Sequence, residues 1–245
     1  MADLAVILVS VTGVSLVSFI GILFVGLKET FVKRILMALV GFSSGSLIGA
    51  AFLDLLPESL EQIGQAIFYY VIVGIVFFFA MEKFLYWRHC HDGKCEVHMF
   101  AYLNLFGDGV HNFVDGVTIA AGFLISYSLG FAVTLAVIFH EIPQELGDFG
   151  VLLYGGFGKK KALTYNFLSA LAAVAGSLVT YYLASQIQGV AHLLVPFAAG
   201  GFIYIAATDL MPELHKKTQG RDALVQLLTI LAGIALMSAV KIALS

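Results

Sequence analysis

Residues 111–116 read His-Asn-Phe-Val-Asp-Gly, and residues 140–148 read His-Glu-Ile-Pro-Gln-Glu-Leu-Gly-Asp. Both stretches lie inside apolar runs that are long enough to cross a membrane as helices. A charged side chain near a bilayer centre costs about 2.5–3.5 kcal/mol on insertion scales, so such residues mark functional sites by default. Imidazoles, carboxylates and amides together form the ligand set of a divalent transition metal. The two stretches therefore predict a metal site within the membrane.

The composition assigns the whole chain to a membrane. Hydrophobic residues make up 60% of the 245 residues and charged residues only 12%, against about 25% charged in a soluble domain. The net charge of −3 gives no reason to expect nucleic acid as a partner. The two cysteines are too few for a disulfide framework. We expect a single membrane domain over residues 1–245, whose apolar N-terminal segment is retained as the first helix.

The apolar runs predict the number of helices. Each run has at least the roughly 20 residues that a transmembrane helix needs. The eight runs cover residues 4–27, 31–56, 66–86, 100–124, 129–153, 162–184, 190–210 and 224–244. The sequence therefore predicts an all-α integral membrane protein with eight transmembrane helices.

The basic residues predict how these helices are oriented. Of the 13 Lys and Arg, all but Lys241 lie in the first, third, fifth and seventh loops. Loops rich in Lys and Arg remain in the cytoplasm. We therefore expect these four loops to be cytoplasmic and both termini to be extracellular, in a multi-pass protein of the plasma membrane.

An internal repeat relates the second and seventh spans. Residues 41–58 match residues 196–213 without a gap, at a constant separation of 155 residues, so that Asp54 aligns with Asp209. The two spans run in opposite directions in the predicted topology. The repeat is therefore expected to be inverted, as in many secondary transporters.

The fourth and fifth spans carry the chemistry. Their polar residues recur at spacings of three and four, which places them in one stripe on each helix. The candidate metal ligands are His111, Asn112, Asp115, His140, Glu141 and Gln144. Zinc accepts nitrogen and oxygen ligands, and iron, manganese and cadmium stay open as alternatives because such ligands do not select one metal. Pro143 is expected to free a backbone carbonyl inside the fifth span, which a membrane tolerates where another group satisfies it.

Other polar residues suggest a route to this site. We predict a candidate pathway formed by Asp54, Glu82, Asp108, Glu145, Asp148, Asp209, Glu213 and His215. Residues 89–98 form a loop with histidines and the cysteines Cys90 and Cys95. This loop is expected either to accept metal transiently or to be an ordinary solvated loop.

The motif His-Asn-Phe-x-Asp-Gly at 111–116, followed by His-Glu-x-Pro at 140–143, resembles the ZIP family of zinc and iron transporters. Residues 166–170 and 199–204 are also similar to that family. The resemblance implies helices arranged as three, two and three, uptake of a divalent metal into the cytosol, and a homodimer. It implies zinc as a transported substrate, no organic cofactor and no enzymatic activity.

The resemblance also implies a binuclear site between the fourth and fifth spans. One ion would be held by His111, Asp115, His140, Glu141 and Gln144. The neighbouring ion would be lined by Asn112 together with the shared residues Asp115, Glu141 and Gln144. Many members have a histidine where this chain has Gln144, which leaves the preference for zinc open. Two other functions remain as alternatives, an intramembrane zinc metalloenzyme and a metal-gated channel.

Overall fold

The computed structural model describes residues 3–24, 26, 28–87, 97–216 and 220–244. Within these ranges every regular element is a helix. The longer elements are α1 (Leu4–Ser15), α3 (Glu29–Gly49), α5 (Ile67–Trp87), α6 (Val97–Ile125), α7 (Tyr127–Tyr154), α8 (Lys159–Ala170), α9 (Ala172–Gln186), α10 (Val190–Ile205) and α12 (Gly220–Leu244). The short elements are η1 (Leu16–Ile20), α2 (Gly21–Phe24), η2 (Ala50–Leu55), α4 (Leu56–Ile63), η3 (Gly64–Ala66), η4 (Ala206–Leu210) and α11 (Met211–His215). The expectation of an all-α protein is confirmed.

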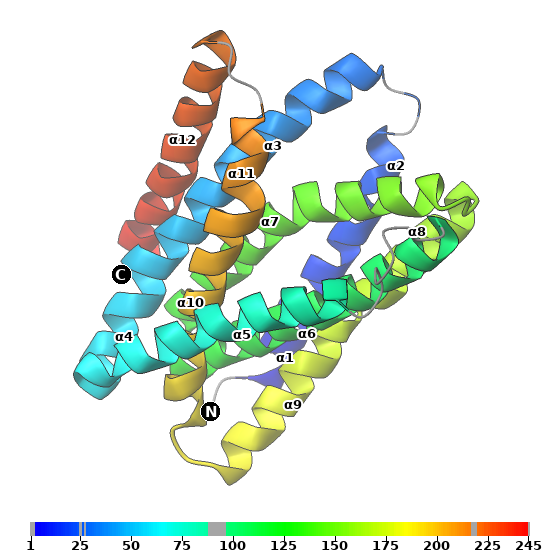
Figure 1. Ribbon diagram of the computed structural model, residues 1–245. Helices are drawn as coiled ribbons and strands as arrows, with labels where there is room; N and C mark the ends of the chain where they lie inside the picture. The colour runs from blue at the N-terminus through cyan, green and yellow to red at the C-terminus, as the bar shows by residue number, and fades with distance from the viewer. Residues whose placement is uncertain (1–2, 25, 27, 88–96, 217–219, 245) are drawn as a thin grey trace.

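In the described part of the chain, six helical stretches are long and apolar enough to cross a membrane. One of them, Arg34–Phe84, has 51 residues and covers most of both the second and the third predicted spans. The chain changes direction within it, between α4 and α5, where Gly64 has a φ of 63° (Figure 1). Helix α6 is not among the six, because its polar residues lower its mean hydropathy. The count of eight spans stays a prediction.

Helices α6 and α7 form a hairpin with a very short connection. Only Ser126 separates them, and its hydroxyl accepts a hydrogen bond from the backbone N–H of Leu129 at 3.1 Å, which caps α7. The two backbones come close at this end: a Cβ atom added to Gly122 would lie only 3.2 Å from the Cα atom of Gly130. The hairpin lies among α3, α9 and α10, which all contact it. It therefore brings the two polar stripes together inside the molecule.

Two pairs of helices around the hairpin pack in the same way, with α3 against α12 and α10 against α5. A Cβ atom on Gly45 of α3 would lie 2.0 Å from the carbonyl oxygen of Ile230. A Cβ atom on Gly200 of α10 would lie 2.2 Å from the carbonyl oxygen of Val71. Gly45 and Gly200 are equivalent positions of the repeat, so the same residue makes the same backbone contact twice.

The opposite sides of these two interfaces match as well. A Cβ atom on Gly74 of α5 would lie 2.1 Å from the carbonyl oxygen of Phe197. A Cβ atom on Gly233 of α12 would lie 2.2 Å from the carbonyl oxygen of Phe42. Phe42 and Phe197 are again 155 residues apart. Glycine is required at all four positions because any side chain would strike a backbone atom.

The two copies of the repeat share a local irregularity. Segments η2 and η4 are π-helical turns, and they contain Asp54 and Asp209 respectively. A proline stands near the start of the helix that follows each one, Pro57 in α4 and Pro212 in α11. Helices α3 and α10, which precede the π-turns, run in opposite directions (Figure 1). Single π-turns inside helices often occur at functional sites.

Candidate metal centre

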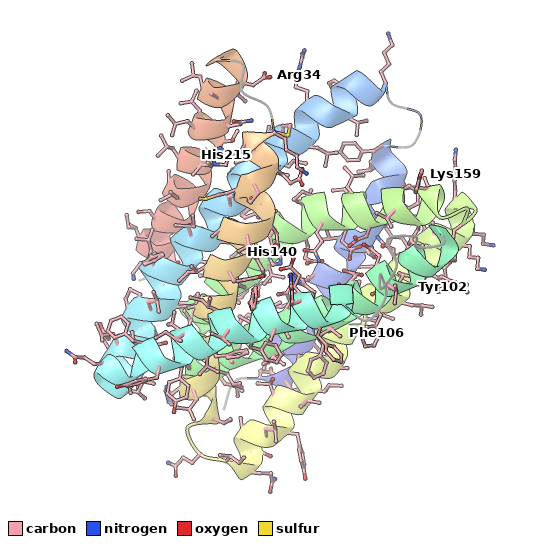
Figure 2. The ribbon with its side chains drawn as sticks, viewed as in Figure 1. Arg34, Tyr102, Phe106, His140, Lys159 and His215 are labelled. Atoms are coloured by element: carbon pink, nitrogen blue, oxygen red, sulfur yellow. The ribbon has the colours of Figure 1, made fainter. Side chains whose placement is uncertain are left out.

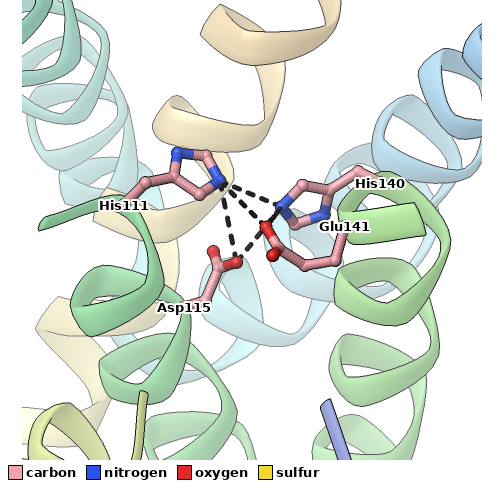
Figure 3. A group of neighbouring side chains, drawn as sticks. All are labelled: His111, Asp115, His140 and Glu141. Carbon is pink, nitrogen blue, oxygen red and sulfur yellow. Dashed lines mark hydrogen bonds and ion pairs between the residues drawn. The ribbon is translucent and has the colours of Figure 1, made fainter. Parts of the chain in front are cut away.

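Four side chains from α6 and α7 meet at the centre of the molecule (Figures 2 and 3). The Nε2 atoms of His111 and His140 are 3.1 Å apart. The His140 Nε2 atom is 3.1 Å from Asp115 Oδ2 and 3.3 Å from Glu141 Oε1. The His111 Nε2 atom is 3.7 Å from Asp115 Oδ2 and 3.5 Å from Glu141 Oε1. All four residues are buried, and we call them the histidine–carboxylate cluster.

A backbone contact orients His140 for binding a cation. Its Nδ1 atom is 3.1 Å from the carbonyl oxygen of Ala136, one turn earlier on α7. Because a carbonyl oxygen can only accept, Nδ1 carries the hydrogen and Nε2 directs its lone pair into the cluster. Metal-binding histidines commonly have their other ring nitrogen held in this way.

Two carboxylate oxygens in the cluster lack a hydrogen-bond donor among the described residues. Asp115 Oδ2 and Glu141 Oε1 are buried and take no hydrogen bond from the described residues. A buried, unpaired carboxylate is costly, and a positive ion removes that cost. Two imidazole nitrogens and two carboxylate oxygens form a set that suits zinc. The four residues are therefore chemically suited to hold a divalent cation.

Aromatic rings close the cluster on its other side. The Phe202 ring meets the His140 ring edge-on with 6.0 Å between centroids, and the Phe78 ring meets His111 in the same way at 6.5 Å. Both phenylalanines are buried. These rings place apolar surface beside both imidazoles.

A second group of acidic residues adjoins the first. Asp108, Glu141 and Glu145 each offer an oxygen atom, and these atoms all lie within 4.8 Å of one another. All three residues are buried. Glu141 belongs to both groups, so the two groups are continuous through a shared carboxylate.

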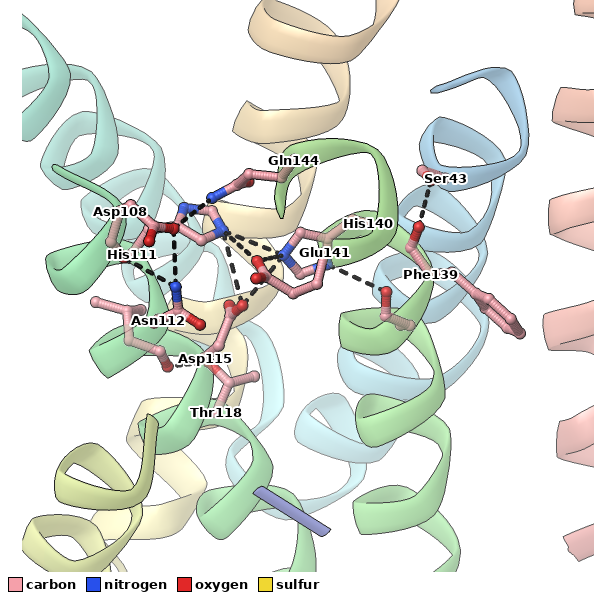
Figure 4. A network of polar contacts seen from close by, with 12 residues as sticks. Ser43, Asp108, His111, Asn112, Asp115, Thr118, Phe139, His140, Glu141 and Gln144 are labelled. Carbon is pink, nitrogen blue, oxygen red and sulfur yellow. Dashed lines mark hydrogen bonds and ion pairs between the residues drawn. The ribbon is translucent and has the colours of Figure 1, made fainter. Parts of the chain in front are cut away.

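The structure places Asn112 and Gln144 beside Asp108 (Figure 4). The Asn112 amide donates to Asp108 Oδ1 at 2.8 Å, and the Gln144 amide donates to the same atom at 3.5 Å. The Asn112 Oδ1 atom is buried and takes no hydrogen bond from the described residues. The two amides therefore face the acidic group.

Two asparagines that were not among the candidate site residues are partners of the acidic residues. The Asn166 amide of α8 donates to Glu145 Oε2 at 2.5 Å. The Asn104 amide of α6 donates to Asp148 Oδ1 at 2.7 Å. Asn104 lies one turn before Asp108, and its spacing already placed it in the polar stripe of the fourth span, although it was not named as a metal ligand. Nothing in the sequence connects Asn166, on another helix, with Glu145.

The remaining pathway candidates are spread over the ends of helices. Glu82 accepts a hydrogen bond from the Tyr204 hydroxyl at 2.5 Å. Asp209 accepts one from the Thr208 hydroxyl at 2.8 Å and is exposed. Three further candidates complete the set: Asp54 is buried in η2, Glu213 pairs with Lys216, and His215 is exposed at the end of α11. The predicted metal-accepting loop, which includes Cys90 and Cys95, falls largely outside the described residues.

The carbonyl that Pro143 frees has a partner. Proline has no N–H to donate to the carbonyl four residues earlier, which belongs to Phe139. The hydroxyl of Ser43 on α3 donates to that carbonyl oxygen at 2.5 Å (Figure 4). The break in α7 directly beside His140 is therefore satisfied by a neighbouring helix.

A comparison with known families shows to which family the chain belongs. The family model described as ZIP zinc transporter matches residues 88–241, which include the whole cluster. The chain belongs to the ZIP family. The expectation from the sequence motifs is confirmed, and the family is one of metal transporters, not of enzymes.

Individual ZIP proteins are similar over most of the chain. Zinc transporter ZIP13 of Pongo abelii is 35% identical over 219 residues, which cover 82% of this chain and 66% of that protein. Zinc transporter YKE4 of Saccharomyces cerevisiae is 32% identical over 246 residues, which cover 83% of this chain and 70% of that protein. The chain thus spans about two thirds of the length of these relatives.

Proposed function

We propose that this ZIP protein binds zinc at the histidine–carboxylate cluster and carries it across the membrane into the cytosol. The observation that carries the proposal is the spacing of the ligand atoms. Zinc bonds of about 2.0–2.1 Å in a tetrahedron require ligand atoms about 3.3 Å apart. The five measured separations between nitrogen and oxygen atoms run from 3.1 to 3.7 Å. These five separations are close to those that a tetrahedral zinc site requires, and this supports the proposal.

A second ion beside the first is supported by the acidic group. Glu141 is shared between the two groups, and the Asn112 oxygen beside them is free to bind a cation. Oxygen ligands suit manganese and iron as well as zinc. We therefore propose a binuclear centre in which Glu141 bridges the ions, with iron, manganese and cadmium as further substrates.

The direction of transport is inferred from charge. Basic residues occupy the loops that the sequence predicts to be cytoplasmic, and Arg34 and His215 lie near the same end of the molecule (Figure 2). Glu82 and Asp209 are both exposed pathway candidates. We propose that metal leaves the cluster past these carboxylates into the cytosol, in a plasma-membrane protein with both termini outside.

The shared π-turns and the reciprocal glycine contacts support an inverted repeat. We propose one domain over residues 1–245, with eight spans arranged as three, two and three, in which the α6–α7 hairpin lies between the two repeats. Membrane lipid would surround the domain, and a second copy of the chain would complete a homodimer.

Uptake of radioactive zinc into proteoliposomes tests the main proposal. We expect saturable uptake by the wild type, and Asp115→Asn or Glu141→Gln to weaken apparent zinc affinity by at least about 100-fold, since outer-shell changes alone cost 10–100-fold. Glu61→Gln is the matched control, because Glu61 is exposed on α4. Full uptake by Glu141→Gln at low zinc would refute the site.

The same vesicles separate the alternative functions. A metal-gated channel would pass other ions in response to zinc, without saturable zinc flux. A metalloenzyme would retain stoichiometric zinc without any flux. Either result with a correctly folded wild type would overturn the proposal of a carrier.

A further inference from the structure

The repeat extends to the helices that pack against α3 and α10. Ile230 of α12 occupies the place that Val71 of α5 occupies in the other copy, since each presents its carbonyl to an equivalent glycine. The separation between these two positions is 159 residues. The same separation relates Glu82 to Lys241. An acidic residue in one copy thus corresponds to a basic residue in the other.

In the copy that contains η4, two carboxylates lie close enough to interact electrostatically. Asp209 interacts electrostatically with Glu82, and both have hydroxyl donors, from Thr208 and Tyr204 respectively. No lysine or arginine among the described residues forms an ion pair with either carboxylate. This end of the pathway therefore attracts cations from solution.

In the copy that contains η2, a lysine takes the position of the second carboxylate. The Lys241 ammonium group donates to the carbonyl oxygen of Leu53 and interacts electrostatically with Asp54. Asp54 is only 7% exposed, and its Oδ2 atom takes no hydrogen bond from the described residues. A backbone carbonyl and a buried carboxylate are oxygen ligands for a cation, and here the Lys241 ammonium group is that cation.

We propose that Lys241 is a tethered cation that holds the place of the metal ion at Asp54, and that incoming metal must displace it. The inference rests on the proposed transport function. A divalent ion carries twice the charge of the ammonium group and can displace it, whereas a monovalent ion has no such advantage. Lys241 therefore acts at the predicted outer mouth as a selectivity residue that raises the metal concentration needed for uptake.

The test compares Lys241→Gln with the wild type in zinc uptake by proteoliposomes. Glutamine removes the charge and retains a donor for the Leu53 carbonyl. We expect the half-saturating zinc concentration to fall by roughly three- to tenfold, the range for losing one partly buried charge interaction. Lys241→Arg should keep the wild-type value. Lys159→Gln is the matched control, because Lys159 is exposed at the start of α8.

A second background shows whether the effect passes through Asp54. In protein that already carries Asp54→Asn, adding Lys241→Gln should no longer change the half-saturating zinc concentration. Any loss of thermal stability caused by Lys241→Gln should be the same with and without Asp54→Asn. Wild-type protein without uptake would refute the transport function itself. Normal wild-type uptake with unchanged or higher half-saturation in Lys241→Gln would overturn the inference alone. An equal decrease in the Asp54→Asn background would also overturn it.

Discussion

Replacing Ser43 with alanine should destabilise the protein through a single backbone oxygen. The Ser43 hydroxyl is the donor to the Phe139 carbonyl, which lost its helical partner to Pro143. Leaving a buried acceptor without a partner costs about 1–3 kcal/mol, and interhelical hydrogen bonds in membranes are worth about 0.6–2 kcal/mol. We therefore expect Ser43→Ala to lower the free energy of unfolding by about 1–2 kcal/mol.

A double-mutant cycle tests this reasoning by thermal or denaturant unfolding in detergent. Pro143→Ala restores an N–H that can bond the Phe139 carbonyl within α7, so Ser43→Ala should cost little in that background. Ser44→Ala is the matched control, because Ser44 is equally buried and its hydroxyl has no partner among the described residues. The reasoning is wrong if Ser43→Ala costs the same with and without Pro143.

Three further outcomes are expected. Gly200→Ala should lower the free energy of unfolding by about 1–3 kcal/mol, because the new Cβ atom would lie 2.2 Å from the Val71 carbonyl oxygen. Gly13→Ala is the control, since nothing lies within 4 Å of a Cβ atom there, and unfolding measurements compare the two variants. Gln144→His should favour zinc over manganese in competition uptake, because imidazole suits zinc, and an unchanged ratio would place residue 144 away from the ion. A membrane-impermeant thiol reagent added outside cells should leave Cys90 and Cys95 unlabelled, and rapid labelling would reverse the predicted topology.

Apolar runs and the spacing of polar residues were enough to predict the helices and the core of the candidate site. Length and hydropathy predict the helices because a bilayer requires every backbone group to be satisfied within a helix. Spacings of three and four residues placed His111 with Asp115 on one face, and the structure brings these together with His140 and Glu141. These inferences depend only on the period of a helix, which a sequence reveals directly.

Contacts between side chains on different helices could not be predicted from sequence periodicity. Asn112 and Gln144 have the same periodicity as the cluster residues, yet they face Asp108, because helix rotation and side-chain rotamers decide between neighbouring positions on one face. The π-turn at Asp54 shifts the register of the residues after it, and no local composition signals it. Ser43 and its acceptor are on different helices, so only the packed structure could pair them.

The one-residue connection between α6 and α7 constrains how an ion can be released. His111 and His140 stand on two helices that are joined by Ser126 alone and that touch closely at Gly122. The one-residue link and the close contact hold the two helices together at this end, so we expect the hairpin to move as one unit. We then expect access to the ion to change mainly through relative movement between the hairpin and the surrounding helices α3 and α10. Movement of the neighbouring helices, and not separation of the ligands, would then expose the ion to solution.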